Sequence, residues 1–180
     1  MKFCHNKKHC EQVSYDQHVH FFTPLASQVQ PGVPFTYTIF GNNTGLIQAE
    51  IGPFTGLLPN TNDFNRQQRH LVVADWTHSG NGLQTFNAFD ALASSTYEFD
   101  SIIFPGDYAY EFWSSNGQLG DEFLQQMQRY DTKWPLMLSA GNHEDNYNFT
   151  FFNEKFRYPG FEQTKNNYFS YNIGPVHYMA

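Results

Sequence analysis

Three short, continuously apolar segments alternate with two helical stripes in the second part of the chain. The apolar segments are 70–74, 101–104 and 135–139, and their uninterrupted apolar character is typical of strands buried on both faces of a sheet. Between them, residues 82–96 and 118–130 place apolar side chains at helical spacing. Because strands joined through a helix run parallel with right-handed crossovers, this order predicts a βαβαβ unit with a parallel sheet.

The first third of the chain carries strand signals of another kind, in which β-branched and aromatic residues lie between turn residues. These signals fall at 18–22, 35–40 and 50–54, with a turn at 30–32. Residues 58–69 are polar and interrupted by proline and asparagine, which predicts a linker. Residues 168–173 and 176–179, joined by Gly174-Pro175, predict a hairpin after the βαβαβ unit.

Composition excludes several classes of protein. The chain has 180 residues with 19 Phe and 11 Tyr, so it has enough apolar surface to fold and is not intrinsically disordered. Ten Lys and Arg stand against 17 Asp and Glu, a net charge of −7, which argues against nucleic acid as a partner. No apolar run approaches the roughly 20 residues of a membrane span.

The basic N-terminus lacks the apolar stretch of a signal peptide. It holds Cys4 and Cys10, which could form a small disulfide loop, bind a metal with His5 and His9, or lie at a chain end without a partner. Two N-glycosylation sequons, Asn42-Asn43-Thr44 and Asn148-Phe149-Thr150, favour a glycoprotein in a secreted or lysosomal/vacuolar setting.

Side chains able to bind metal follow each predicted parallel strand. Asp75 follows the first strand, Gly106-Asp107-Tyr108-Ala109-Tyr110 the second, and Gly141-Asn142-His143-Glu144 the third. Open α/β sheets bind ligands at this end of their strands. Oxygen donors suit a hard divalent or trivalent cation, which also offsets the repulsion between two carboxylates. Asp75 alone could instead cap the following helix, but the other two loops favour a metal site.

The motifs Gly106-Asp107-x-x-Tyr110 and Gly141-Asn142-His143-Glu144 resemble those of the purple acid phosphatases, in the calcineurin-like metallophosphoesterase superfamily. Residues 29–41 and 51–54 are similar to the closing strands of the fibronectin type III-like domain that precedes the catalytic domain in that family. The resemblance therefore implies a mixed fold, α+β with an α/β part. It divides the chain into 1–57, the C-terminal part of the fibronectin type III-like domain; 58–69, a linker; and 70–180, the N-terminal half of a metallophosphoesterase β-sandwich with βαβαβ units.

The resemblance also implies a dinuclear metal centre with Fe(III) and a divalent ion (Zn, Mn or Fe). Asp75 would bind the ferric ion, and Asp107 would bridge both ions. Tyr110 would bind the ferric ion as a phenolate, and Asn142 would bind the divalent ion through its amide oxygen. His143 and Glu144 would be catalytic: His143 beside the substrate phosphate, and Glu144 orienting it.

The activity implied is that of an acid phosphatase, which hydrolyses phosphate monoesters with a metal-bound hydroxide as the nucleophile. Two alternatives stay open: a calcineurin-like phosphodiesterase with another metal pair, and a non-catalytic relative that serves as a binding or structural domain. Neither alternative involves a membrane span or nucleic acid, and the oligomeric state is not indicated by the sequence.

Two features depart from the family pattern. Its first motif is Asp-x-Gly, whereas this chain has Asp75-Trp76-Thr77. The family's remaining ligands are three histidines in Val-x-x-His and Gly-His-x-His motifs, which would follow the predicted hairpin, and the sequence ends at Ala180 without them. We therefore expect the chain to be a truncated form that is inactive as a phosphatase by itself.

Overall fold

The structure is a computed structural model that describes residues 2–6, 9–12, 33–40, 47–55 and 67–180. The predicted strand at 18–22, the turn at 30–32 and residues 58–66 of the predicted linker lie outside the described residues. Within the described part of the chain, no helix is long and apolar enough to cross a membrane.

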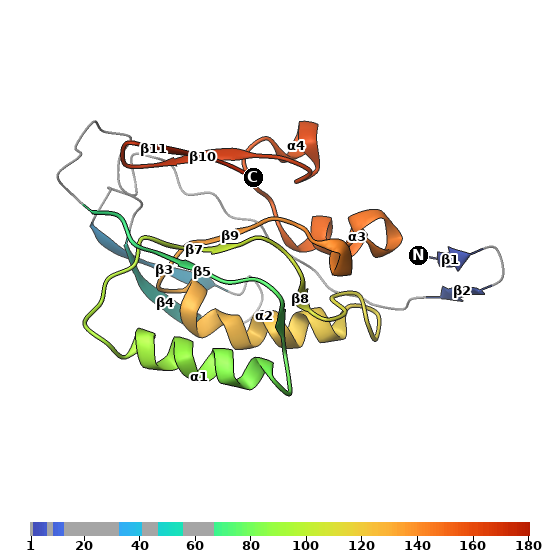
Figure 1. Cartoon of the computed structure of the whole chain (residues 1–180), viewed down its shortest axis with the longest axis horizontal. Coiled ribbons are helices and arrows are strands. Elements are labelled where there is room, and N and C mark those ends of the chain that lie inside the picture. The colour runs from blue at the N-terminus through green and yellow to red at the C-terminus, as the bar shows by residue number, and fades with distance from the viewer. Residues whose placement is uncertain (1, 7–8, 13–32, 41–46, 56–66) are drawn as a thin grey trace.

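A parallel sheet forms the centre of residues 67–180, as the sequence predicts (Figure 1). Its strands are β5 (His70–Val72), β7 (Ser101–Phe104) and β9 (Leu136–Leu138), in the order β5-β7-β9. The middle strand β7 is the most deeply buried, and Ile102 and Phe104 have no exposed surface. Two further short strands, β6 (Trp76–Thr77) and β8 (Tyr108–Ala109), pair in parallel just beyond the ends of β5 and β7.

Two helices cover one face of this sheet, α1 (Gly82–Ala93) and α2 (Gln118–Asp131) (Figure 1). Their apolar stripes meet the indole of Trp76, which is 1% exposed. The Trp76 ring centroid lies 4.5 Å from that of Phe86, 4.7 Å from Phe89 and 5.8 Å from Phe123. Aromatic pairs at these distances add about 0.5–1.5 kcal/mol each beyond simple burial, so Trp76 anchors both helices to the loop after β5.

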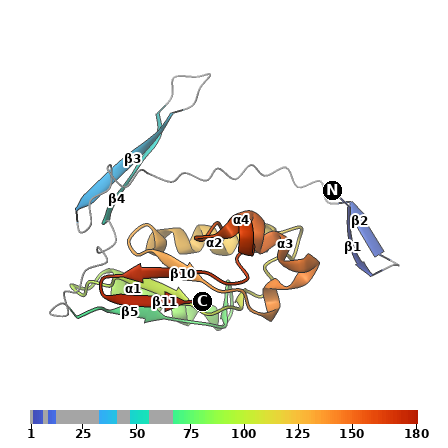
Figure 2. The ribbon, with the colours of Figure 1, turned by 90° about the horizontal axis from the view of Figure 1, so that it is seen from above.

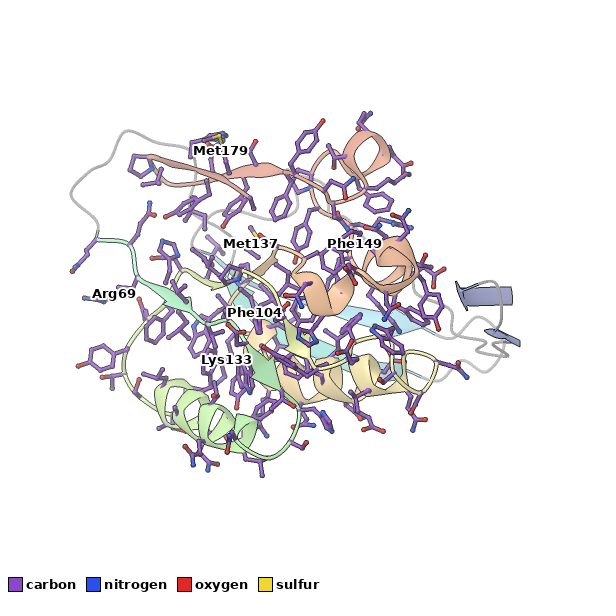
Figure 3. The ribbon with its side chains drawn as sticks, turned by 45° about the vertical axis from the view of Figure 1, so that its right-hand side comes forward. Arg69, Phe104, Lys133, Met137, Phe149 and Met179 are labelled. Atoms are coloured by element: carbon purple, nitrogen blue, oxygen red, sulfur yellow. The ribbon has the colours of Figure 1, made fainter. Side chains whose placement is uncertain are left out.

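The opposite face carries the 3₁₀ turn η1 (Asn142–Glu144), helices α3 (Asn146–Lys155) and α4 (Phe161–Thr164), and an antiparallel hairpin of β10 (Ser170–Ile173) and β11 (Val176–Met179) (Figures 1 and 2). The hairpin confirms the prediction for this segment. Figure 3 shows Phe104 in the interior and Met179 at the outer side of the hairpin, where Met179 is 83% exposed.

Two antiparallel pairs precede the sheet in the chain. They are β1 (Lys2–Asn6) with β2 (His9–Gln12), and β3 (Pro34–Phe40) with β4 (Ile47–Thr55). The second pair confirms the strands predicted at 35–40 and 50–54. Its assignment to a fibronectin type III-like domain over residues 1–57 stays a prediction.

Two buried tyrosines of the core differ in the partners of their hydroxyl groups. Tyr108 is fully buried, and its hydroxyl has no hydrogen-bond partner among the described residues. The Tyr130 hydroxyl lies 2.9 Å from the carbonyl oxygen of Phe86 and 2.8 Å from Oδ1 of Asp90. Burial, together with the hydrogen bond to Asp90, raises the pKa of Tyr130 to about 12, although Arg129 acts in the opposite direction, so the hydroxyl is a donor throughout the physiological range.

We predict opposite effects when each hydroxyl is removed. Tyr108→Phe should leave the free energy of unfolding unchanged or raise it by up to about 1 kcal/mol, because a buried unpaired polar group is lost. Tyr130→Phe, the matched control, should lower it by about 1–2 kcal/mol because Tyr130 makes a buried hydrogen bond. Urea denaturation of both variants measures the difference, and a larger loss for Tyr108→Phe would contradict the assignment.

Candidate functional site

The three loops that follow the parallel strands converge at one end of the sheet. The backbone N–H of Asp75 donates to the carbonyl oxygen of Gly106 at 3.3 Å, and that of Trp76 donates to the carbonyl oxygen of Asp107 at 3.0 Å. These two bonds join the loop after β5 to the loop after β7. The third loop, which begins the turn η1, approaches the second through Asp107 itself.

Asp75 and Tyr110 are in direct contact. The Tyr110 hydroxyl donates to Oδ1 of Asp75 at 2.7 Å, although the residues are 35 positions apart. Burial raises the pKa of Tyr110 above the usual value, and the hydrogen bond to Asp75 and the nearby charges of Asp75 and Asp107 add to the effect. Without a cation the phenol is therefore a protonated donor.

Asp107 lies between the second and third loops. The backbone N–H of His143 donates to Oδ1 of Asp107 at 3.1 Å, and the preceding Asn142 is exposed at the start of η1. Gly141 makes the close approach possible, since a Cβ atom there would lie 2.0 Å from the same Oδ1. A side chain at Gly141 would displace the Asp107 carboxylate.

The buried Glu144 side chain joins the second and third of these loops, and the residue is 2% exposed. Its Oε2 accepts the backbone N–H of Gly141 at 2.7 Å and of Asp107 at 2.9 Å, and its Oε1 accepts that of Tyr108 at 3.1 Å. Burial raises the pKa of Glu144, while the three N–H donors act in the opposite direction. The carboxylate thus satisfies three N–H groups that the loops cannot pair within a sheet.

The His143 side chain contacts Glu111 directly. Its Nδ1 lies 2.7 Å from Oε1 of Glu111, and the other oxygen of that carboxylate accepts the indole N–H of Trp113 at 2.7 Å. The His143 ring also packs on the Tyr110 ring, with centroids 4.2 Å apart. In the structure the His143 ring therefore contacts Glu111 and Tyr110, and the expectation that Glu144 orients His143 stays a prediction. The one sequence signal for Glu111 is its position directly after Tyr110.

The donor chemistry of these loops fits a hard cation. Asp75 and Asp107 offer carboxylates, Tyr110 a phenol and Asn142 an amide oxygen, which are ligands that hard ions prefer. Among the described residues, no three His, Cys, Asp or Glu side chains form a metal-binding group by themselves. Asp75, Asp107 and Tyr110 all have positive φ angles, of 53°, 60° and 39°. Such uncommon backbone conformations concentrate at functional sites.

Comparison with known proteins shows the family of the chain. The profile of the family described as "Calcineurin-like phosphoesterase" matches residues 68–178, which is more than half of the chain. The chain belongs to the calcineurin-like phosphoesterase family. The matched range spans the sheet, both covering helices and all three of the converging loops.

The relatives found within the family are acid phosphatases. The chain is 32% identical over 155 residues to "Acid phosphatase type 7" of Mus musculus, a match that covers 85% of this chain and 32% of the mouse protein. It is 38% identical over 82 residues to "Acid phosphatase type 7" of Danio rerio, covering 46% of this chain and 18% of that protein. The chain thus spans about a third or less of the length of these relatives.

A solved structure shares the fold. It is the purple acid phosphatase PPD1 from yellow lupin seeds, with a TM-score of 0.66 and 17% sequence identity over 83% of this chain and 30% of that chain. The family fold also accommodates Thr77, where the resemblance implies glycine. Thr77 lies in β6 and pairs with Ala109, and Gly82 leaves room for its side chain, since a Cβ at Gly82 would lie 3.0 Å from the Thr77 Cγ2.

We predict that Glu144 and Glu111 differ in what they stabilise. Glu144→Gln should lower the free energy of unfolding by about 2–3 kcal/mol, because an amide cannot accept three N–H bonds with both of its ends. Glu111→Gln should change it by less than about 1 kcal/mol, since the Glu111 side chain is 37% exposed. Urea denaturation at neutral pH measures both variants, and equal losses would show that Glu144 is not the residue that braces the loops.

Proposed function

We propose that the protein is an acid phosphatase that hydrolyses phosphate monoesters at a dinuclear ferric–divalent metal centre. The observation that carries the proposal is the convergence of three strand-end loops, where Tyr110 contacts Asp75 and the third loop donates to Asp107. Membership of the calcineurin-like phosphoesterase family and the names of the relatives support it.

Four residues of this chain would hold the metal ions. Asp75 and Tyr110 already share a hydrogen bond, so one cation could replace the shared proton and bind both oxygens. Asp107 would bridge to a second ion, which Asn142 would bind from the third loop. When bound, the pair of ions would withdraw electron density from the phosphoryl group and acidify a water molecule. The ferric ion is proposed for the Asp75–Tyr110 side, and Zn, Mn or Fe for the other.

His143 would bind the substrate phosphate. Because Glu111 engages Nδ1, the ring is fixed with Nε2 as the nitrogen available to a phosphate oxygen, and the Tyr110 ring limits its rotation. The His143 side chain is 27% exposed, so a phosphate at the surface of the site could reach it. Glu144 would act indirectly, by holding the backbone of Gly141 and Asp107 in place.

A secreted or lysosomal setting and N-glycosylation are part of the proposal. Asn148, the acceptor of the second sequon, is exposed. It lies in the irregular first turn of α3, where Tyr147, Asn148 and Phe149 have left-handed backbone angles. The first sequon lies outside the described residues.

Asp107→Asn should lower kcat/KM for p-nitrophenyl phosphate at acid pH by about a hundredfold or more, because both ions depend on this carboxylate. The assay uses the longest natural form of the protein, loaded with Fe(III) and Zn(II). Glu122→Gln on the exposed face of α2 removes the same charge and serves as the control. Unchanged turnover in Asp107→Asn would contradict the metal assignment. Faster hydrolysis of bis(p-nitrophenyl) phosphate than of the monoester would instead indicate a phosphodiesterase.

Tyr110→Phe should abolish the visible absorption band that the protein acquires on binding Fe(III), because only the phenol oxygen can give tyrosinate-to-iron charge transfer. The phenyl ring keeps nearly the same volume and its packing on His143, so the far-ultraviolet circular dichroism should not change. Tyr97→Phe, an exposed tyrosine after α1, is the matched control. A coloured Tyr110→Phe protein would show that another residue supplies the ligand.

A further inference from the structure

The hairpin β10–β11 is attached to the parallel sheet through side chains and not through a backbone ladder. Within the described residues the hairpin forms a sheet of its own, separate from β5-β7-β9 (Figure 1). His70 on β5 lies at the centre of the attachment. Its Nδ1 is 2.8 Å from Oγ of Ser101 on β7, and its Nε2 is 2.7 Å from the hydroxyl of Tyr178 on β11.

Gln68 completes the connection to both strands of the hairpin. The Tyr178 hydroxyl donates to Oε1 of Gln68 at 2.7 Å, and Nε2 of Gln68 donates to the carbonyl oxygen of Ile173 on β10 at 2.6 Å. The rings add packing, because His70 meets Tyr178 edge-on at 5.3 Å and Tyr178 stacks on Tyr171 at 5.1 Å.

When the His70 imidazole is neutral, the hydrogen-bonding hydrogens of Ser101, His70 and Tyr178 can each be donated to one acceptor in this network. The Ser101 hydroxyl donates to Nδ1 of His70, and the Nε2–H donates to the Tyr178 oxygen. The Tyr178 hydroxyl then donates to Gln68. This assignment of hydrogens follows from the capacity of each group to donate and accept. It leaves none of these polar atoms without a partner.

A protonated imidazole does not fit as well. Its Nδ1 becomes a donor, so the Ser101 hydroxyl can no longer donate to it and must turn elsewhere within a fully buried position. The ring charge is also partly removed from water, since His70 is half-buried. Burial accordingly lowers the pKa of His70, while the charge of Asp100, beside β7, acts in the opposite direction. The ionisable group that meets the ring from the hairpin is the phenol of Tyr178, with the phenol of Tyr171 stacked behind it, and burial raises the pKa of each.

We propose that the network of His70, Ser101, Tyr178 and Gln68 is a pH-sensitive clip, which holds the hairpin on the sheet at neutral pH and loosens as the pH falls. The pKa of His70 is lower in the folded chain than in the unfolded chain. The stabilisation is therefore complete above about pH 6.5 and is lost as the pH falls from there through the lower folded value. The clip does not depend on the proposed metal centre.

The test is hydrogen exchange of the hairpin amides between pH 7.5 and 5.5, measured by mass spectrometry and corrected for the intrinsic exchange rates. Protection of residues 170–179 in the wild type should fall with decreasing pH, and the part of this fall that comes from His70 should not exceed about tenfold per pH unit, since it is the titration of one imidazole. His70→Gln should be less protected at pH 7.5 and should lose this part of the pH dependence. His177→Gln is the matched control on the same hairpin, where its ring contacts only Asn172 at 2.8 Å among the described residues. It should behave as the wild type.

Asp131 also titrates in this range, because burial raises its pKa to about 6, and it remains in His70→Gln. The comparison of the two proteins therefore isolates the part of the pH dependence that comes from His70. A pH dependence in His70→Gln equal to that of the wild type would overturn the proposal. If that variant does not fold, Tyr178→Phe keeps the ring stacking and should show lower hairpin protection at pH 7.5. NMR titration of wild-type His70 gives an independent result, and a pKa at or above 6.5 would also overturn the clip.

Discussion

The buried carboxylate of Glu144 is the constraint on which the candidate site depends. Two of its three N–H donors belong to the loop after β7, and the third belongs to the loop after β9. Without these bonds, three backbone donors would be buried and unpaired where the strands have ended. The same bonds bring Gly141 against Asp107, at a distance that leaves no room for a Cβ atom. The loop geometry and the site geometry therefore have one cause.

The aromatic core positions the remaining loop. Trp76 follows Asp75 directly, and its indole N–H donates to the carbonyl oxygen of Gly82 at 3.0 Å while its ring packs against α1 and α2. Because Trp76 is held by this hydrogen bond and by packing on both helices, the backbone of the neighbouring Asp75 has little freedom, and its side chain stays beside Tyr110. Packing among apolar rings thus determines where an anionic, exposed carboxylate lies, which is the preorganisation that a metal site needs.

The charge of these loops supports the proposal of a metal site. Asp75, Asp107, Glu111 and Glu144 lie within one small region, and the direct contacts there include one phenol and one imidazole. Two of the carboxylates are satisfied by donors from this chain: Glu144 by backbone N–H groups, and Glu111 by Trp113 and His143. Asp75 and Asp107 accept one hydrogen bond each, from the Tyr110 hydroxyl and the His143 N–H, and they are the residues proposed for the metal ions.

The sequence by itself determined the order of elements and the residues at the strand ends. Continuous apolar runs predict the strands β5, β7 and β9, because a strand buried on both faces has apolar side chains at every position. Apolar residues at helical spacing predict α1 and α2, because only one stripe of each helix is buried. Strand direction then places Asp75, Asp107 and Asn142 at one edge. The fibronectin type III-like assignment and the linker stay predictions, because they rest on residues that the structure largely does not describe.

The tertiary structure alone decided which side chains touch. His143 and Glu111 are 32 positions apart, and His70 and Tyr178 are 108 positions apart. Two of the three backbone bonds of Glu144 reach residues 36 and 37 positions away, while the third, to Gly141, lies within its own loop. The spacing of residue types along the sequence does not predict such contacts, because they depend on the conformation of the strand-end loops and on the position of the hairpin relative to the sheet. Residue types could therefore be predicted to serve a site, but their partners had to be found in the folded chain.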